Sequence, residues 1–279
     1  MNYLKTGEII CKRRKELGLT QNQLAGILSI SFQAVSKWEN GAAYPDIEIL
    51  PKLAEALNTT VDALLGYQSA ATGYDKKYSA EGYYWGLKPN NMCYDIMKVL
   101  PPVMPYRVLD MGCGEGKDAV FLAKCGYVVS AFDTSRQGLE KAKALADHNQ
   151  VEVNFFRADI WDYLPEQEFD IIFCSGVLHF LPMSRRKELC GSLKEHTADG
   201  GINALNVFVK KPFVAPAPDN TKEEEEMEPW YSGELFQYYH DWLFPVCRED
   251  LFDCNSGGIP HKHCMDTLIA QKVEQEETT

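Results

Sequence analysis

The sequence predicts an α/β protein with a mostly parallel sheet, preceded by a small all-helical domain. Three observations predict this arrangement. The chain has 279 residues, more than one ordinary domain needs. Residues 1–66 carry helical periodicity and capping signals, whereas strand-like and helix-like segments alternate from residue 106 onward. We therefore expect a helical domain at 1–66, a linker of small and polar residues at 67–77, and an α/β domain at 78–279.

Charge is distributed unevenly between these two domains. The formal net charge is −12, but residues 1–66 hold seven Lys/Arg and seven Asp/Glu and are neutral. The acidic remainder disfavours a nucleic-acid partner for the second domain. The first domain contains the basic run Lys12–Lys15, so only this domain is a candidate for binding an anionic polymer.

Targeting signals and cysteine spacing indicate the compartment. The first residues, Met1–Lys5, lack an apolar signal core, and no run approaches the roughly 20 apolar residues of a membrane span. The nine cysteines include no C-x-x-C pair and are typical of reduced thiols. We expect a cytoplasmic protein with no membrane partner.

Local signals in the first domain predict a pair of short helices joined by a tight turn. A helix over residues 6–18 ends on a glycine, and Thr20 with Gln23 forms a capping box that begins the next helix. Ser31 caps a third helix, which closes at Gly41. Two such helices are the unit with which many proteins read DNA.

Residues 19–66 resemble the Cro/phage-repressor family of helix-turn-helix domains along their whole length, which implies five helices. The resemblance implies that Gln21 contacts a phosphate and that Gln33, Ala34 and Lys37 face the major groove. The chemistry agrees, because Gln can bond to adenine and Lys to guanine or phosphate. The alternative is that Gln33 and Lys37 are merely solvated. A homodimer, with half-sites about 34 Å apart, would compensate for the weak binding of one domain.

The α/β alternation of the second domain places ligands at the carboxyl ends of the strands. Helix-like segments occupy 118–126, 136–148 and 185–196, and strand-like segments occupy 106–112, 127–133, 151–159, 169–176 and 202–209. After the first strand comes the glycine-rich run 110–116, whose glycines allow positive φ and close approach of the backbone to a ligand. Asp133 follows the second strand and suits a ribose diol. Asp159 and Ile160 follow the third and suit an adenine.

The glycine spacing separates this site from nicotinamide and phosphate-loop sites. It reads G-x-G-x-G, with Lys117 where the nicotinamide fingerprint needs its last glycine, and no G-x-x-x-x-G-K-[ST] occurs. The pattern resembles motif I of the Rossmann-like class I methyltransferases, which implies a seven-stranded sheet and S-adenosylmethionine as cofactor. A purely structural turn is the alternative. Residues expected at the cofactor are Asp110, Gly112, Cys113, Gly114, Gly116, Asp133, Thr134, Asp159, Ile160, Cys174 and Ser175.

Four further segments resemble the tellurite-resistance methyltransferases over roughly residues 78–272: 84–89, 108–133, 169–181 and 233–242. The resemblance implies that Tyr84, Trp85 and Gly86 help to close the cofactor site. Burial of Trp85 in the hydrophobic core is an equal alternative. The acidic, proline-rich insert at 210–229 departs from that family and is either a lid or a solvated loop.

Methyl transfer is an in-line displacement that needs orientation and, for some acceptors, a base or a cation. Candidates are His179 after the fourth strand, Lys88 in the entry segment, and His261 with His263, which strand alternation places on one face. His179 is as readily a structural residue. Zinc binding by His261, His263 and Cys264 would lack the paired cysteines that are typical of zinc sites, so no metal is expected.

The sequence thus predicts a methyltransferase acting on a small molecule, fused to a DNA-binding domain. A chalcogen oxyanion such as tellurite, a thiol and another metabolite stay open as acceptors. The alternative is a transcription regulator that senses S-adenosylmethionine without turnover. Methylation of a nucleic-acid base is disfavoured, because the segment after the fourth strand, Cys174–Val177, lacks the [DNS]-P-P-[YFW] pattern of enzymes that methylate base amines.

Overall fold

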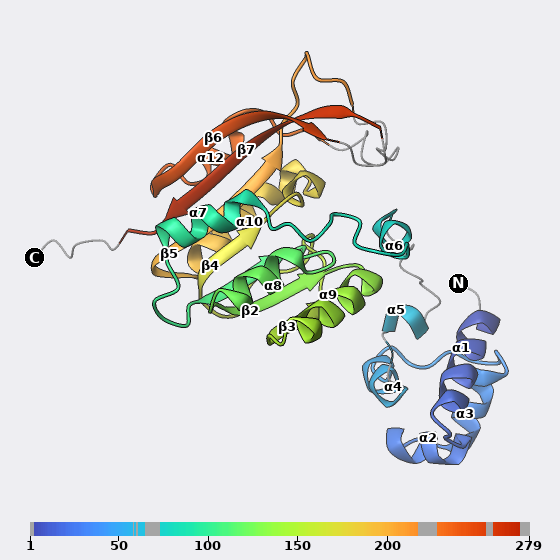
Figure 1. The fold of residues 1–279 in the computed structure, drawn as a ribbon. Helices are drawn as coiled ribbons and strands as arrows, with labels where there is room; N and C mark the ends of the chain where they lie inside the picture. The colour runs from blue at the N-terminus through green and yellow to red at the C-terminus, as the bar shows by residue number, and fades with distance from the viewer. Residues whose placement is uncertain are drawn as a thin grey trace, which may run out of the picture. The chain divides into compact units, whose positions relative to one another are not determined.

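The structure, a computed structural model, describes residues 3–57, 59, 61–64, 73–216, 228–254 and 259–273. The chain forms two compact units that divide between Thr72 and Gly73 (Figure 1). Of the expected linker, 67–72 lies outside the described residues, and Gly73 begins helix α6 (Gly73–Tyr78) of the second unit. No described helix combines the length and apolar character that crossing a membrane requires.

The first unit is helical, as expected. Its described helices are α1 (Tyr3–Glu16), α2 (Gln21–Leu28), α3 (Phe32–Glu39), α4 (Leu50–Ala56) and α5 (Val61–Leu64). The capping box forms: the Thr20 hydroxyl accepts the Gln23 N–H at 3.2 Å, and Gln23 Oε1 accepts the Thr20 N–H at 2.8 Å. Ser31 Oγ accepts the Ala34 N–H at 3.3 Å and begins α3. Local hydrogen bonding therefore fixes where both helices of the pair begin.

A largely buried ion pair ties the helix pair to α1. Arg14 Nε lies 2.5 Å from Glu39 Oε1, and Arg14 Nη1 donates to the Leu19 carbonyl at 2.6 Å. Gln21 Nε2 donates to Glu39 Oε2 at 2.8 Å. Burial alone would raise the pKa of Glu39, but the hydrogen bonds from Arg14 and Gln21 outweigh it and lower the pKa below its ordinary value. The pair fixes α1 against the beginning of α2 and the end of α3.

The second unit contains a seven-stranded sheet in the order β3-β2-β1-β4-β5-β7-β6. Its strands are β1 (Arg107–Met111), β2 (Val128–Asp133), β3 (Val153–Arg157), β4 (Phe169–Cys174), β5 (Thr197–Phe208), β6 (Leu243–Cys254) and β7 (His261–Gln271). The first five strands are parallel, and β7 runs antiparallel to both of its neighbours. The expected mostly parallel α/β sheet is confirmed.

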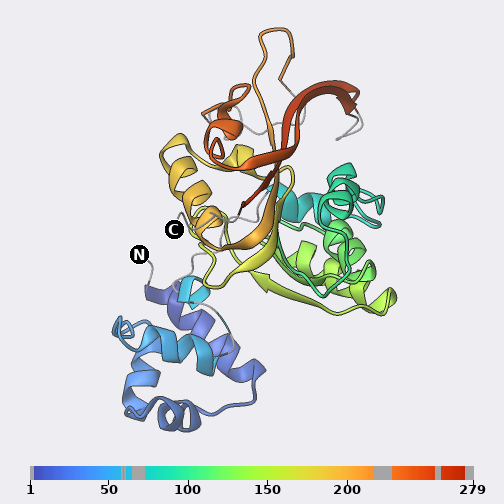
Figure 2. The same cartoon turned by 90° about the vertical axis from the view of Figure 1, so that its left-hand side faces the viewer.

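Helices cover both faces of this sheet (Figures 1 and 2). One face carries α7 (Asn91–Val99), α8 (Lys117–Lys124) and α9 (Arg136–His148), and the other carries α10 (Met183–Glu195) and α12 (Glu234–Gln237). Because both faces are covered, β1 is buried at four successive residues instead of alternating. A short 3₁₀ helix, η1 (Leu178–Phe180), follows β4.

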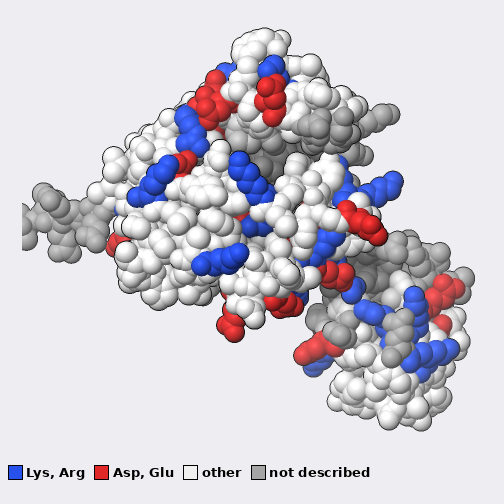
Figure 3. Space-filling model, viewed as in Figure 1, with Lys and Arg blue, Asp and Glu red and all other residues white. Residues whose placement is uncertain are grey.

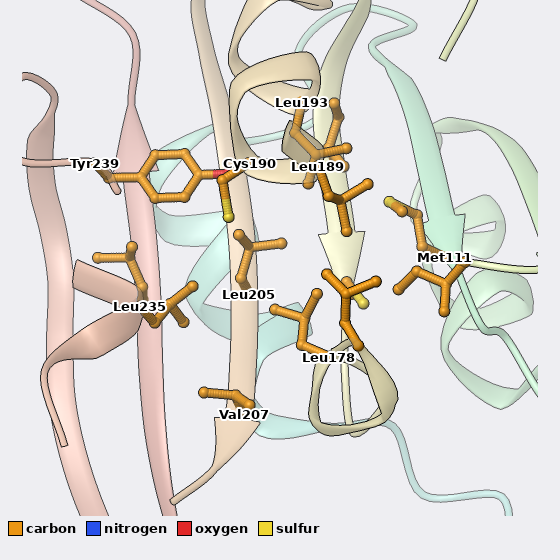
Figure 4. Packing of buried hydrophobic residues seen from close by; sticks show 14 of the residues in the cluster. Met111, Leu178, Leu189, Cys190, Leu193, Leu205, Val207, Leu235 and Tyr239 are labelled. Atoms are coloured by element: carbon orange, nitrogen blue, oxygen red, sulfur yellow. The ribbon is translucent and has the colours of Figure 1, made fainter. Parts of the chain in front are cut away.

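The larger hydrophobic core lies between the sheet and α10 with α12. Leu178, Leu205 and Leu235 pack there with Tyr239 (Figure 4), and all four are fully buried. The hydroxyl of Tyr239 donates to Asn203 Oδ1 at 2.7 Å, so its burial leaves no polar atom without a partner. This core holds the carboxyl ends of β1, β4 and β5 at fixed positions beneath the candidate site.

Candidate functional site

The loop after β1 is fastened to the neighbouring strand. The backbone N–H groups of Gly112 and Cys113 both donate to the Phe132 carbonyl of β2 at 2.8 Å. Gly112 and Gly114 have φ of +78° and +54°, a region that strains residues with a side chain. The sequence G-x-G-x-G therefore gives a tight bend in a fixed position at the carboxyl edge of the sheet.

Within the protein, the glycines make room for neighbouring side chains. A Cβ on Gly112 would lie 2.4 Å from Val177 Cγ2, and a Cβ on Gly114 would lie 2.8 Å from the Tyr78 hydroxyl. Sequence reasoning explained these glycines by the close approach of a ligand. The structure adds a second requirement, the packing of α6 and of the segment after β4 onto the loop.

Two carboxyl groups converge on this loop. Asp133 Oδ2 accepts the Gly114 N–H and its Oδ1 accepts the Ser135 N–H, both at 2.8 Å. Asp110 is buried, and its Oδ2 has no hydrogen-bond partner among the described residues. Burial, and to a lesser extent the neighbouring Asp118 and Asp133, raise the pKa of Asp110 well above its usual value. Burial also raises the pKa of Asp133, against the opposing effect of its two N–H bonds.

This pair of acids suits a ligand that carries positive charge and a sugar. A buried carboxyl group without a partner costs free energy, and a cationic ligand removes that cost. The orphaned oxygen of Asp110 therefore fits the sulfonium and ammonium groups of S-adenosylmethionine. Asp133, held by two backbone donors, retains lone pairs for hydroxyl groups.

The segment before β1 closes over the glycine loop. Glu115 Oε2 accepts the Tyr84 N–H at 2.7 Å, and Glu115 Oε1 pairs with Lys141 Nζ at 2.8 Å. The indole N–H of Trp85 donates to the Tyr78 hydroxyl at 3.2 Å. The structure thus brings Tyr84 and Trp85 to the loop where sequence reasoning expected them, and Trp85 keeps 43% of its surface exposed.

Sequence reasoning missed Tyr78, Glu115 and Asp75 in this closure. Tyr78 is buried against Gly114, and Asp75 accepts a hydrogen bond from Ser135 Oγ at 2.5 Å. Asp75 had been assigned to the linker because its surroundings lack an apolar period. The spacing of Tyr74 and Tyr78, one helical turn apart, was the available signal.

Two of the residues expected at the cofactor are buried in the core. Ile160 and Cys174 are buried in the larger hydrophobic cluster, whose members include Phe132. Asp159 is exposed, and its Oδ1 accepts the Trp161 N–H at 3.0 Å. The Thr134 carbonyl accepts Arg157 Nε at 2.9 Å. These residues surround the ends of β2, β3 and β4 without converging as Asp110 and Asp133 do.

Ser175, after β4, belongs to an amide network. Its Oγ accepts Asn90 Nδ2 at 2.9 Å and Asn206 Nδ2 at 3.0 Å. Asn206 Oδ1 also accepts the Gly176 N–H at 2.7 Å. The network links the amino end of α7 to β4 and β5. It was not visible in the sequence, because its members are up to 116 positions apart (206 − 90).

A cavity of about 830 Å³ adjoins this network and includes Lys88 in its wall. Lys88 is exposed and makes no ion pair or hydrogen bond with the described residues. Arg248, also in the wall, is paired with Asp95 at 2.9 Å and Asp250 at 3.0 Å. Lys98, the third cation of the wall, pairs with Asp95 at 3.0 Å, so Lys88 is the cation of this wall that is not neutralised by a described acid.

The candidate histidines His179, His261 and His263 lie near one another at the strand ends. They do not line this cavity, although the ring of Phe252 in its wall lies 5.8 Å from that of His263. The ring of His179 is 4.0 Å from that of Phe180 and 4.9 Å from that of Phe208, which in turn lies 4.5 Å from the ring of His263. Burial, together with His263, lowers the pKa of His179 to about 3. His179 is therefore neutral at physiological pH and a weak base. His261 Nε2 lies 2.9 Å from His263 Nε2.

On the helical unit, Gln33 and Lys37 are exposed on α3 and Ala34 is half-buried. Figure 3 shows lysine and arginine side chains gathered on one face of this unit. Arg14, of the basic run, is engaged with Glu39, and so is Gln21. Of the four residues expected at DNA, Gln33 and Lys37 are thus exposed, while Gln21 would first have to leave Glu39.

Comparisons with known proteins agree with both units. Residues 12–64 match the helix-turn-helix family, and residues 108–201 match the methyltransferase domain family. The probable S-adenosyl-L-methionine-dependent methyltransferase TehB of Haemophilus influenzae is 25% identical over 223 residues, which cover 78% of this chain and 72% of TehB. Hemagglutinin 1 of Eikenella corrodens is 31% identical over 183 residues, which cover 63% of this chain and 58% of that protein.

The crystal structure of TehB from Haemophilus influenzae superimposes with a TM-score of 0.57 at 24% identity, covering 72% of this chain. The chain spans 66% of that TehB chain, slightly less than two thirds. The fold and the two matches show a methyltransferase domain that follows a helix-turn-helix domain. TehB is similar to the part of this chain that includes its methyltransferase domain.

We predict that Gly114→Ala destabilises the second unit through Tyr78. Positive φ alone costs a residue with a Cβ about 1–2 kcal/mol, and the overlap with the Tyr78 hydroxyl adds to this. In a Tyr78→Phe background the added part disappears, so the loss of unfolding free energy is smaller there. Urea unfolding of the four proteins measures the difference, with Gly191→Ala on α10, which meets no atom within 4 Å, as control. Equal losses in both backgrounds would contradict the packing described.

Proposed function

We propose that this protein transfers a methyl group from S-adenosylmethionine to a small-molecule acceptor. The observation that carries the proposal is the convergence of Asp110 and Asp133 on the glycine loop, with one oxygen of Asp110 buried and unpartnered. S-adenosylmethionine supplies an electrophilic methyl group on a positively charged sulfur. The match of residues 108–201 to the methyltransferase domain supports the same cofactor.

Each side chain at the loop has a distinct task in this proposal. Asp133, oriented by Gly114 and Ser135, accepts hydrogen bonds from the ribose hydroxyls. Asp110 balances the positive charge of the donor. Tyr84 and Trp85 hold the entry segment against Glu115 and exclude water, which strengthens the electrostatic contribution of both acids.

The acceptor binds, in this proposal, in the cavity whose wall includes Lys88 and Asn206. An unpaired lysine beside amide groups favours an anion or a group that becomes anionic. A chalcogen oxyanion and a thiolate both fit this description. Because methyl transfer is in line, orienting the acceptor can supply most of the acceleration without a covalent step. His179 is not among the residues that line this cavity, and with its low pKa it would not act as a base.

Asp133→Ala is expected to weaken S-adenosylmethionine binding. A hydrogen bond to a charged group contributes about 1.5–3 kcal/mol, or roughly a 10- to 100-fold change in affinity. Titration calorimetry on the full chain measures this, with Glu140→Gln on the exposed side of α9 as matched control. Unchanged affinity in Asp133→Ala, or no binding by the unmodified protein, would refute the site. Binding without turnover across an acceptor panel would favour the S-adenosylmethionine sensor instead.

We further propose that α3 binds DNA through Gln33 and Lys37, with Ala34 facing the bases. Both side chains project into solvent, and the match of residues 12–64 to the helix-turn-helix family supports the placement. Gln21 would exchange Glu39 for a phosphate. A pair of chains on two half-sites would give the affinity that one neutral domain lacks. The cytoplasm is the compartment where this binding and reduced cysteines coexist.

A gel shift with DNA from upstream of the protein's own gene tests this placement. Lys37→Ala and Gln33→Ala are expected to weaken the specific complex, each by about 1–3 kcal/mol if the side chain reads a base. Lys52→Ala, which removes an exposed lysine from α4, is the charge-matched control for Lys37. If Lys52→Ala weakens binding as much as Lys37→Ala does, recognition by α3 is contradicted. Adding S-adenosylmethionine reports whether the cofactor alters DNA affinity.

A further inference from the structure

Strands β6 and β7 bring together three side chains that are typical metal ligands. The antiparallel register pairs Cys254, the last residue of β6, with His261, the first residue of β7. It pairs Phe252 with His263 two positions further along. Cys254 Sγ and one nitrogen of each imidazole all lie within 4.8 Å of one another, and all three residues are half-buried.

We propose that Cys254, His261 and His263 bind a divalent transition-metal ion, and that zinc is the ion this set favours. Thiolate and imidazole ligands together select zinc over the harder calcium and magnesium ions. With zinc bonds of about 2.0–2.1 Å to nitrogen and 2.3 Å to sulfur, tetrahedral ligand atoms lie roughly 3.3–3.6 Å apart. The two Nε2 atoms, 2.9 Å apart, need to separate by only a few tenths of an ångström.

The surroundings of the two imidazoles already resemble those of metal ligands. His261 Nδ1 lies 2.7 Å from the Ile259 carbonyl, so that Nδ1 carries the proton and Nε2 offers its lone pair to the cluster. Metal-binding histidines commonly have such a carbonyl partner, which fixes the tautomer. The rings of Phe208 and Phe252, at 4.5 and 5.8 Å, restrict the ring of His263.

The competing interpretation is a single hydrogen bond between the two imidazoles. In that case His263 Nε2 carries a proton that it donates to His261 Nε2, and Cys254 takes no part in this hydrogen bond. Zinc would take the place of that proton, move the His263 proton to Nδ1 and bind Cys254 as the thiolate. The thiol proton would leave to solvent. The participation of Cys254 is therefore what separates the two interpretations.

Three protein ligands leave the fourth tetrahedral position open, as in catalytic zinc sites. That position would take water or an anionic sulfur or oxygen ligand. The site lies beside Phe208, which His179 also contacts, at the carboxyl edge of the sheet. His261 and His263 would then be metal ligands. This role would replace two expectations drawn from the sequence, namely that the two histidines act as a base and that the protein binds no metal. Cys264 is buried, and strand alternation places it on the opposite face from His263.

Metal titration of the full chain tests the site without any need for turnover. After chelator treatment under a non-thiol reductant, zinc binding is followed by calorimetry, and cobalt binding by its tetrahedral and thiolate-to-metal absorption. We expect one ion per chain. Cys254→Ser, His261→Ala and His263→Ala should each weaken zinc by at least about 10-fold, since even outer partners of a ligand change affinity by that much. Cys254→Ser should abolish the thiolate band.

Two variants serve as matched controls, Cys247→Ser, an exposed cysteine on β6, and His240→Ala, an exposed histidine. Both should bind zinc as the unmodified protein does, and circular dichroism confirms that every variant folds. Absence of stoichiometric zinc, a thiolate band that survives in Cys254→Ser, or equal losses in the controls would overturn the site. Calorimetry with S-adenosylmethionine is run separately, so a failed cofactor site and a failed metal site give different results.

Discussion

The second unit depends on one backbone carbonyl, that of Phe132, which accepts the N–H groups of both Gly112 and Cys113. These two bonds fix the bend after β1 to the end of β2. Asp133, the next residue on that strand, can then reach back to the Gly114 N–H. Because the bend is fixed, Asp110 near the end of β1 and Asp133 at the end of β2 keep their places beside it. Burial raises the pKa of both carboxyl groups, and a cationic ligand would favour their ionised forms.

The sequence predicted those features whose causes are local. Backbone donors at the two helix starts are satisfied by side chains within three residues, those of Thr20 and Ser31, so both starts could be predicted. The glycine bend could be predicted from its G-x-G-x-G spacing. Helix α6 was missed because its stability comes from Tyr78 packing on Gly114, a contact between residues 36 positions apart (114 − 78). Strand β6 was missed because this largely exposed edge strand lacks a fully buried apolar face.

Roles that depend on burial or on register were outside the reach of the sequence. His179 was a reasonable candidate base by type, but burial beside His263 leaves it neutral. Cys264, the neighbour in sequence, was considered as a partner of the histidines, whereas the register of β6 and β7 brings Cys254. A single position of register decides which face of a strand a side chain occupies. Local periodicity alone does not show which of the two cysteines lies beside the histidines.

The affinity for S-adenosylmethionine as a function of pH, compared with that for S-adenosylhomocysteine, tests the central claim most directly. Since the pKa of Asp110 is raised, its carboxyl group stays protonated above its ordinary range, and only the ionised form attracts a sulfonium. The account predicts that S-adenosylmethionine affinity rises with pH, that S-adenosylhomocysteine, which lacks the sulfonium charge, responds less, and that Asp110→Asn removes the difference. Parallel pH profiles for both ligands, unchanged in Asp110→Asn, would contradict it.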